Sequence, residues 1–436
     1  MIPIPTWRLA VVAVVVSAGA LVLPLELWPT VVALNVVVLA LLVADAVLAP
    51  QPAALPVTRQ LPSAMLVGQH DRVEWRVTND TNRPLSVAVA DELAPSLNAD
   101  DRRFRARLPA GTESRATSRL APTRRGSFLV NKLTVRTHGP MGLAARQHTR
   151  LLPAILRVYP PFRSRDEAEL RIHRARLLEV GLRSTRGRGG GTDFDQLRDY
   201  QADDEFRRID WAATARAQRP IVRTYRAERN QTVVQLLDNG RVMAGQVDGV
   251  PRVEHAMDAV MMLTAVAGHL GDKAGLVAFD SQVRAVVPPA SGRTQMGAVT
   301  EALFDLAPSL QAADYRGAFT HTLARFRRRS LLVLYTDLVE QAVGESLLPA
   351  LPMVAAQHLL IVAAVRDPDI VRWSNEQPDD EVETYRQAAA LATLADRDRA
   401  AARLRSMGAT VIDAPPAELS TRLADTYLGI KATGRL

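Results

Sequence analysis

The sequence predicts a multi-domain chain with two N-terminal membrane helices, a β-sandwich and an α/β domain whose sheet is mostly parallel. Three observations lead to this prediction. Two uncharged apolar runs lie in the first 50 residues, short alternating strands follow them, and strand and helix patterns alternate in the C-terminal half. The length of 436 residues is typical of two or three domains. We predict a membrane anchor over 1–50, a β-sandwich domain over 55–160, a connecting arm over 161–229 and an α/β domain over 230–436.

The apolar runs predict membrane-spanning helices over about 8–25 and 27–48, each close to the minimum length for a span. The break between them, Pro24–Pro29, contains one charged residue, Glu26, and is short enough for a helical hairpin. Such a hairpin returns the chain to the side on which it began.

Basic residues predict the orientation of this hairpin. Arg8 flanks the first helix at its beginning, Arg59 and Arg72 follow the second, and the turn contains no Lys or Arg. The positive-inside rule therefore places the N-terminus and the C-terminal domains in the cytoplasm, in a multi-pass protein of the bacterial inner (plasma) membrane. The alternative is a signal peptide cleaved near Ala18–Ala20, with one remaining span, which would export the rest of the chain.

The region 55–160 predicts a β-sandwich of immunoglobulin-like type, because short period-two strands alternate with polar turns. We expect strands over 72–78, 85–91, 114–120, 126–137 and 151–159. The region shows no catalytic set of residues. We interpret His138 and His148 as structural residues at strand ends rather than metal ligands.

The C-terminal half predicts a parallel sheet covered by helices on both faces. We expect strands over 232–237, 274–279, 284–287, 330–335, 359–365 and 409–412, and helices over 252–270, 292–306, 315–326, 383–407 and 416–428. Pro288-Pro289 should end the third strand. Ligands of such sheets bind beyond the carboxyl ends of the strands, where Asp238 and Asp337 fall.

The arm carries a dense set of charged and aromatic residues: Gly191, Phe194, Arg198, Tyr200, Asp204, Arg207, Asp210, Trp211 and Arg216. Asp210 with these aromatic residues could be a catalytic acid beside a stacking surface. However, the segment contains no His and no nucleophile with a base. We therefore predict a structural role, in which Arg198 or Arg207 pairs with Asp204 or Asp210 and Trp211 fills an apolar groove.

The order of these motifs resembles a known bacterial family, the domain of unknown function 58. The order is a Gly-rich loop, Arg-x-Tyr, an acidic turn, Ile-Asp-Trp and a strand that ends in Asp238, and the resemblance covers nearly the whole chain. It implies a von Willebrand factor type A-like α/β domain. It also implies an adaptor or scaffold that works with a MoxR-type AAA+ ATPase in the assembly or maturation of protein complexes.

The same resemblance implies a cation site that this sequence has partly lost. The von Willebrand type A pattern is Asp-x-Ser-x-Ser after the first strand, a Thr from a later loop and an Asp after the fourth strand, and it commonly binds Mg²⁺ or Mn²⁺. Here Gly240 and Val242 stand at the two Ser positions and Ala313 at the Thr position. Only Asp238 and Asp337 remain as possible ligands.

We therefore predict a metal-free edge that binds a protein partner. Asp238 should be paired with Arg241 or with backbone N–H groups at the strand end. Asp238, Asn239, Arg241 and Asp337 would form the partner-binding edge and supply charge complementarity. Asn239 and water could still support weak binding of magnesium or manganese.

Composition and motifs limit the remaining functions. The absence of cysteine excludes disulfides, thiolate metal sites and a Cys nucleophile. Acidic residues alternate with arginines between Arg183 and Arg229, so the net charge of +8 does not predict a nucleic-acid partner. Gly187–Gly191 lacks the phosphate-loop pattern and is interpreted as a hinge. We predict no catalytic residues and no enzyme; the alternatives are a metal-dependent adhesion or sensing module and an exported cell-wall hydrolase.

Overall fold

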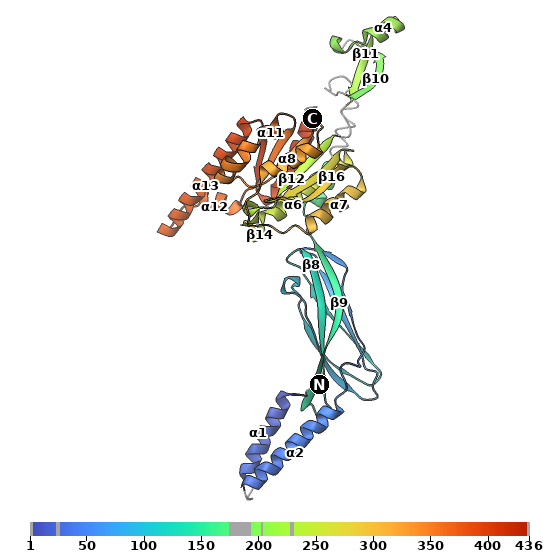
Figure 1. Cartoon of the computed structure of the whole chain (residues 1–436), viewed down its shortest axis with the longest axis vertical. Coiled ribbons are helices and arrows are strands. Elements are labelled where there is room, and N and C mark those ends of the chain that lie inside the picture. The colour runs from blue at the N-terminus through green and yellow to red at the C-terminus, as the bar shows by residue number, and fades with distance from the viewer. Residues whose placement is uncertain (1–2, 23–26, 174–192, 202–203, 227–230, 434–436) are drawn as a thin grey trace. The chain divides into compact units, whose positions relative to one another are not determined.

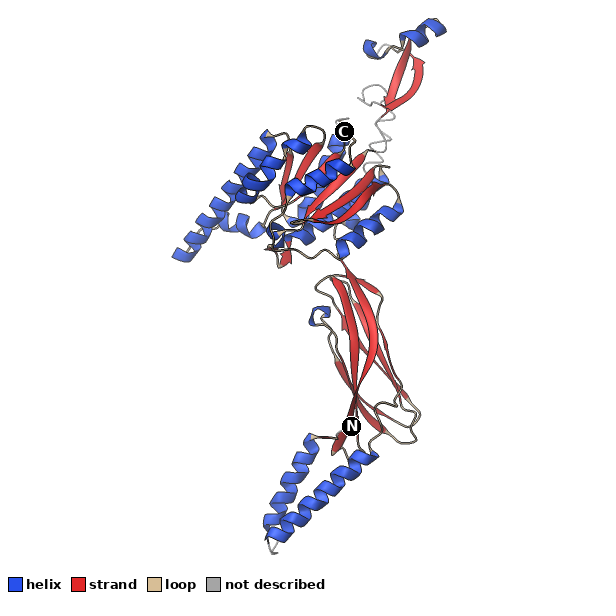
Figure 2. Ribbon diagram, viewed as in Figure 1, coloured by secondary structure: helices blue, strands red, loops and turns tan. Residues whose placement is uncertain are grey.

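The computed structural model describes residues 3–22, 27–173, 193–201, 204–226 and 231–433 (Figure 1). The chain divides into two compact units, Met1–Pro161 and Phe162–Leu436. Figure 2 shows the helices in blue, the strands in red and the loops in tan. The Gly187–Gly191 segment and Gly191 of the arm motif lie outside the described residues.

The first unit begins with a short strand and two apolar helices: β1 Ile4–Pro5, α1 Trp7–Val22 and α2 Leu27–Leu48. Within the described residues, one helical stretch, Trp28–Leu48, is long and apolar enough to cross a membrane. The apolar stretch of α1 is shorter, Trp7–Gly19. One of the two expected spans is therefore supported by length and composition.

The end of α2 is tied to the β domain by a buried carboxylate. Asp45 is fully buried, and its side chain accepts hydrogen bonds of 2.7 Å each from the backbone N–H groups of Met141, Leu143 and Ala144. A side chain at Gly139 would clash with the Asp45 carboxylate, so this turn requires Gly. The Gly139–Leu143 turn therefore has a clear physical role as a cradle for Asp45.

The β domain consists of two sheets that share one core. One sheet has the order β1-β9-β8-β5-β6, with β3 on β9, and the other has the order β2-β4-β7. The strand bounds are β2 Val57–Gln60, β3 Ala64–Leu66, β4 Asp71–Thr78, β5 Leu85–Asp91, β6 Arg103–Leu108, β7 Glu113–Leu120, β8 Gly126–His138 and β9 Ala144–Tyr159. Alternate residues of both sheets, such as Trp75 and Val135, meet in the core.

All five strands predicted for this region are present, whereas β2, β3 and β6 were not predicted. Gly126 begins strand β8, as predicted. Arg59, which was expected to flank the second membrane helix as a basic residue, lies on strand β2 of the β domain. It is buried and pairs with Asp91 at 2.7 Å, and Asp91 also accepts a hydrogen bond from the Trp75 indole. This polar group joins the two sheets, because Arg59 lies on β2 and Asp91 on β5.

The arm is a hairpin of strands β10 Asp193–Asp199 and β11 Ile221–Arg226. Its connection contains the short helical turn η2 Phe206–Arg208 and helix α4 Trp211–Ala217. The strand pair was not predicted, because both strands are rich in charged residues and lack apolar alternation.

The α/β domain has one six-stranded sheet of order β16-β15-β12-β17-β18-β19. All neighbouring pairs are parallel except β15–β16. The strands are β12 Thr232–Asp238, β15 Lys273–Phe279, β16 Val283–Ala290, β17 Leu331–Tyr335, β18 Leu359–Val365 and β19 Thr410–Ala414. Each predicted strand is present. Pro288-Pro289 does not end the third one, because β16 is an edge strand and tolerates residues without an N–H group.

Helices cover both faces of this sheet. Helices α6 Arg252–His269, α7 Arg293–Phe304 and α14 Pro416–Ala432 pack in one core, and α8 Tyr315–Arg325 and α13 Glu381–Ser406 pack in the other. These five helices were predicted. The unpredicted elements are short: α5 Arg241–Ala244, β13 Gln246–Val247, β14 Val250–Pro251, α9 Glu340–Ala342, the π-helical turn η3 Val343–Leu347, α10 Leu348–Ala350, α11 Pro352–Ala355 and α12 Pro368–Asn375.

Candidate functional site

The candidate site is the carboxyl edge of the α/β sheet, where the sequence places two acidic residues. Asp238 ends β12, and Asp337 lies two residues beyond the end of β17. The two strands are parallel neighbours, with Leu237 opposite Tyr335. The structure therefore brings the two predicted carboxylates to the same edge, and both are buried, with exposures of 0% and 3%.

Asp238 is held by hydroxyl and backbone groups. Its Oδ1 accepts from the N–H of Gly240 at 2.7 Å. Its Oδ2 accepts from the Tyr315 hydroxyl at 2.8 Å and from the Thr336 hydroxyl at 2.7 Å. The expected backbone partner is thus present, and two hydroxyl groups reach this carboxylate from positions that the sequence pattern did not identify.

Burial, the largest influence, raises the pKa of Asp238 above its ordinary value, although the hydrogen bonds from Thr336, Gly240 and Tyr315 oppose this shift. A carboxyl group with a raised folded pKa binds protons more strongly in the native state than in the unfolded state. Its contribution to stability is fully present below its unfolded pKa, about 3.9, and is lost as the pH rises through the folded pKa.

We predict that the Asp238→Asn variant loses the pH dependence of stability that Asp238 causes. The free energy of unfolding of the wild type should fall relative to that of the variant as the pH rises from about 4. Urea unfolding of both full-length proteins across this pH range measures the difference, and all shared carboxyl groups cancel in the comparison. A difference that stays constant with pH would contradict the assignment.

Asp337 belongs to a second buried network. Its Oδ1 lies 2.6 Å from Nη1 of Arg397, and its Oδ2 lies 3.4 Å from Nε of Arg252. Arg397 also donates to Asp413 at 2.7 Å from Nη2 and 3.3 Å from Nε. Burial by itself lowers the pKa of Arg397, but the charges and hydrogen bonds of Asp337 and Asp413 outweigh burial and raise it.

These contacts do not fit a divalent cation at the edge. Mg²⁺ requires free carboxylate oxygens in near-octahedral geometry. The Asp238 oxygens already accept three hydrogen bonds, and the Asp337 oxygens face two guanidinium groups whose charge would repel the ion. The residues present favour charge compensation by arginine and hydroxyl groups over coordination of a metal.

The other two residues of the predicted edge have different environments. Arg241 is exposed, and the contacts recorded for the Asp238 carboxylate come from other residues, so the expected Arg241 pairing is wrong. Asn239 is buried and donates from Nδ2 to the carbonyl of Ala307 at 2.5 Å, while its Oδ1 has no partner among the described residues. Asn239 therefore fixes the neighbouring loop.

Exposed apolar side chains stand on loops at this edge. Leu310 is 79% exposed, and the carbonyl of its neighbour Gln311 accepts from the N–H of Arg241 at 2.8 Å. Val339, just after Asp337, is 41% exposed. Val339 also borders a hollow of about 540 Å³, whose other lining residues are Glu340, Gln341, Gly344, Glu345, Asp396 and Arg403. The edge thus combines exposed apolar side chains with charged ones.

The arm contains one of the predicted ion pairs. Arg198 binds Asp204 in a bidentate manner, at 2.8 and 2.5 Å. Burial of Asp204 tends to raise its pKa, but the hydrogen bonds from Arg198 and the Gln201 backbone outweigh it and lower the pKa. Asp210 is the N-cap of α4 and pairs at 2.8 Å with Arg223, an arginine that the sequence analysis did not single out.

Trp211 does not fill a groove among the described residues. Its side chain is 61% exposed and packs edge-on against Phe206, itself 68% exposed, with ring centroids 5.6 Å apart. Arg207 and Arg216 are also exposed. Tyr200 joins the hairpin ends through its N–H, which donates to the carbonyl of Pro220, and the Phe194 side chain lies outside the described residues.

Of the two histidines that were expected at strand ends, His138 is placed as predicted, at the end of β8. His148 instead lies within β9, opposite Val135. Burial, followed by the charge of Arg136, lowers the pKa of His138. Within the described residues, no cluster of three or more His, Cys, Asp or Glu residues could hold a metal ion.

Sequence reasoning missed the residues that complete the edge: Arg252, Asp280, Tyr315, Thr336, Arg397 and Asp413. Asp280 follows β15, is 1% exposed and pairs with Arg284 at 2.7 Å. Its position directly after an apolar strand matches that of Asp238 and was a usable signal. The arginines and Tyr315 lie on helices, where the sequence gives no such signal.

Part of the chain is similar to known proteins. Three uncharacterized proteins, one from Mycobacterium bovis and two from Mycobacterium tuberculosis, are each 26% identical over 182 residues, which is 41% of this chain and 56% of theirs. The chain thus aligns with little more than half the length of these relatives. A crystal structure of the CARDB domain of the PF1109 protein from Pyrococcus furiosus, in complex with di-metal ions, covers 24% of this chain and 91% of that domain at 16% identity and a TM-score of 0.19.

Proximal thread matrix protein 1 from the mussel byssus covers 48% of each chain at 13% identity and a TM-score of 0.28. Such low scores carry no argument about this chain. The family comparison is more direct, because residues 196–377, from β10 through α12, match the family described as "Protein of unknown function DUF58". This segment, which includes most of the arm hairpin and both acidic strand ends, is similar to the DUF58 family over 182 of the 436 residues of the chain.

Proposed function

We propose that the protein is a membrane-anchored adaptor or scaffold that binds a protein partner through the carboxyl edge of its α/β sheet. The observation that carries the proposal is the exposed Leu310 near the exposed Arg241: the first residue of α5, Arg241, donates a backbone hydrogen bond to Gln311, the neighbour of Leu310. Apolar and arginine side chains are typical anchors of protein interfaces. Asp238 and Asp337 are buried, so they would shape this edge from within rather than contact the partner.

A von Willebrand factor type A-like domain is the fold that we propose for this unit. Counted from β12, the sheet has the order 3-2-1-4-5-6, with the third strand antiparallel at the edge. This order reverses at β12, and ligands of open α/β sheets bind at such a switch point. Since the edge carboxylates are compensated by arginines and hydroxyl groups, the proposed recognition is metal-free.

The anchor that we propose is a two-helix hairpin. Thr6, just before α1, donates from its N–H to Leu143 and from its hydroxyl to Gly142, and Asp45, near the end of α2, binds the same turn. The beginning of α1 and the end of α2 therefore meet at one place on the β domain. If both helices cross the bilayer, this geometry keeps the N-terminus and the β domain on the same side, and we propose the cytoplasmic side.

The proposed partner is a MoxR-type AAA+ ATPase, which rests on the resemblance of the motifs to the family. Tagged full-length protein would be purified from gently solubilised native membranes and its partners identified by mass spectrometry. We expect an AAA+ ATPase to be enriched, and the Arg241→Glu/Leu310→Asp variant to recover about tenfold less of it. The matched control is Leu391→Asp, which changes a 52% exposed leucine on α13.

Three outcomes would contradict the proposal. Equal loss of the ATPase in the Leu391→Asp control would exclude the carboxyl edge as the binding face.

A metal-dependent adhesion or sensing module would release or absorb heat on titration with millimolar Mg²⁺ or Mn²⁺. We expect no such heat, because the edge carboxylates are already paired. An exported cell-wall hydrolase needs an external C-terminus, which a reporter fusion at the C-terminus detects.

A further inference from the structure

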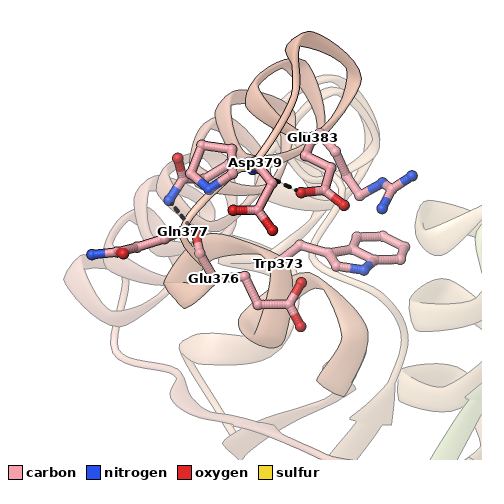
Figure 3. A pocket seen from close by; sticks show the side chains of 8 residues that line it. Trp373, Glu376, Gln377, Asp379 and Glu383 are labelled. Atoms are coloured by element: carbon pink, nitrogen blue, oxygen red, sulfur yellow. Dashed lines mark hydrogen bonds between the residues drawn. The ribbon is translucent and has the colours of Figure 1, made fainter.

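A hollow of about 290 Å³ lies between α12 and the beginning of α13. This volume is close to the lower limit of small ligand pockets, about 300 Å³. Figure 3 shows side chains from both helices and from the connection between them around the hollow. Its lining includes Trp373, Glu376, Asp379, Glu383 and Arg386.

The hollow is acidic, although the chain as a whole has a formal net charge of +8. Glu376 pairs with Arg372 at 3.2 Å. Glu383 accepts from the N–H of Asp379 at 2.9 Å, and Asp380 caps α13, so these two carboxylates have roles in the helix start. The Asp379 carboxylate has no hydrogen-bond or ionic partner among the described residues, and Figure 3 draws it toward the hollow, near Trp373 and Glu376.

The aromatic wall of the hollow already binds a guanidinium group. Arg386 places its Cζ 5.7 Å from the centroid of the Trp373 ring. This distance is within the range of cation–π attraction, about 6 Å. A hollow with a guanidinium-binding ring and an unpaired carboxylate selects a cationic ligand rather than an anionic or purely apolar one.

Arginine fits this combination better than lysine does. Its planar guanidinium can stack on an aromatic ring and also bind a carboxylate with two parallel hydrogen bonds, whereas an ammonium group is a compact point charge. Val382 and Tyr385, at the beginning of α13, are 65% and 69% exposed. They offer apolar contacts to residues that flank an arginine in a peptide, which a free cation would not use.

We propose that this hollow receives an arginine side chain from an extended segment of a protein partner. The guanidinium binds Asp379 and stacks on Trp373, in place of or beside Arg386. The proposal deepens the protein-binding role described above, but the two can fail independently, because the peptide test uses neither the ATPase nor variants of the sheet edge.

The test uses the full chain in detergent micelles with 5-fluorotryptophan in place of its five tryptophans. The Trp373 fluorine signal is assigned from its loss in Trp373→Phe. The probe is the peptide acetyl-Tyr-Arg-Gly-amide, and its citrulline counterpart is the neutral control of equal shape. We expect a saturable shift of the Trp373 signal with a dissociation constant on the order of 1 mM for the arginine peptide, and much weaker binding of the citrulline peptide.

Variants of exposed residues, which do not threaten folding, locate the binding. Asp379→Asn should lower the affinity for the arginine peptide about three- to fivefold. Arg386→Gln should raise this affinity, because the change frees the Trp373 ring and removes a repelling charge. The matched control Asp305→Asn, an exposed acid at the end of α7, should have no effect. Equal binding of the two peptides, no shift at Trp373, or equal weakening by Asp379→Asn and Asp305→Asn would each overturn the proposal.

Discussion

Replacing Arg397 by methionine should lower the free energy of unfolding of the α/β unit by about 3–5 kcal/mol. Arg397 is 5% exposed and lies between Asp337 and Asp413, at 2.6 and 2.7 Å. Methionine preserves much of the apolar contact but leaves two carboxylates close together in a buried place. In this variant Asp337 would still have Arg252 as a cationic partner. Asp413 would lose Arg397, with which it pairs in the wild type.

Urea unfolding of the full chain, read by pulse proteolysis within residues 231–433, measures this loss. The matched control is Arg399→Met on the same helix, whose side chain is 55% exposed and pairs with Glu340. Exposed pairs contribute about 0–1 kcal/mol, so this control should change little. The double variant Arg397→Met/Asp413→Asn should recover part of the stability. Equal losses for Arg397→Met and Arg399→Met would show that the buried pairs do not hold this edge together.

The sequence predicted the strands of the α/β sheet well, because buried parallel strands are continuous apolar runs with sharp ends. Leu359–Val365 has the predicted bounds, and Asp238 was placed at a strand end for the same reason. The partners of the edge carboxylates could not be found in this way. Tyr315 lies 77 residues from Asp238 in the chain, and Arg397 lies 60 residues from Asp337. Periodicity identifies which face of a helix is buried but not which distant loop it meets.

In the arm, one ion pair could be predicted from the sequence but the strands could not. Its charges made an Arg–Asp pair predictable, and the Arg198–Asp204 pair is present. The choice of Arg223 for Asp210 depends on the hairpin, in which β11 returns beside β10. Polar strands give no periodic signal, so the hairpin and this pairing were not predicted. The exposure of Trp211 was also missed, because residue type indicates how much apolar area a side chain has and not whether this chain covers it.

Replacing Asp45 by alanine should loosen the junction between the membrane anchor and the β domain. Three backbone N–H groups, those of Met141, Leu143 and Ala144, would lose a charged acceptor at 2.7 Å. Hydrogen bonds to a charged group contribute about 1.5–3 kcal/mol each, and water entering the opened turn would replace part of this. We expect a local loss of about 3 kcal/mol, which corresponds to about 100-fold faster opening-limited exchange of these amides.

Hydrogen exchange of the full chain in micelles, read on peptides that contain residues 139–145, measures the effect. Gly139→Ala is an independent test, because its Cβ would occupy the place of the Asp45 carboxylate and should raise exchange of the same amides. Asp80→Ala, in an exposed turn of the same unit, is the control and should leave them protected. Since Thr6 binds the same turn, the segment before α1 should also exchange faster when Asp45 is lost. Protection that persists in both the Asp45→Ala and Gly139→Ala variants would mean that the turn holds its shape without the carboxylate, and that Asp45 does not stabilise the junction.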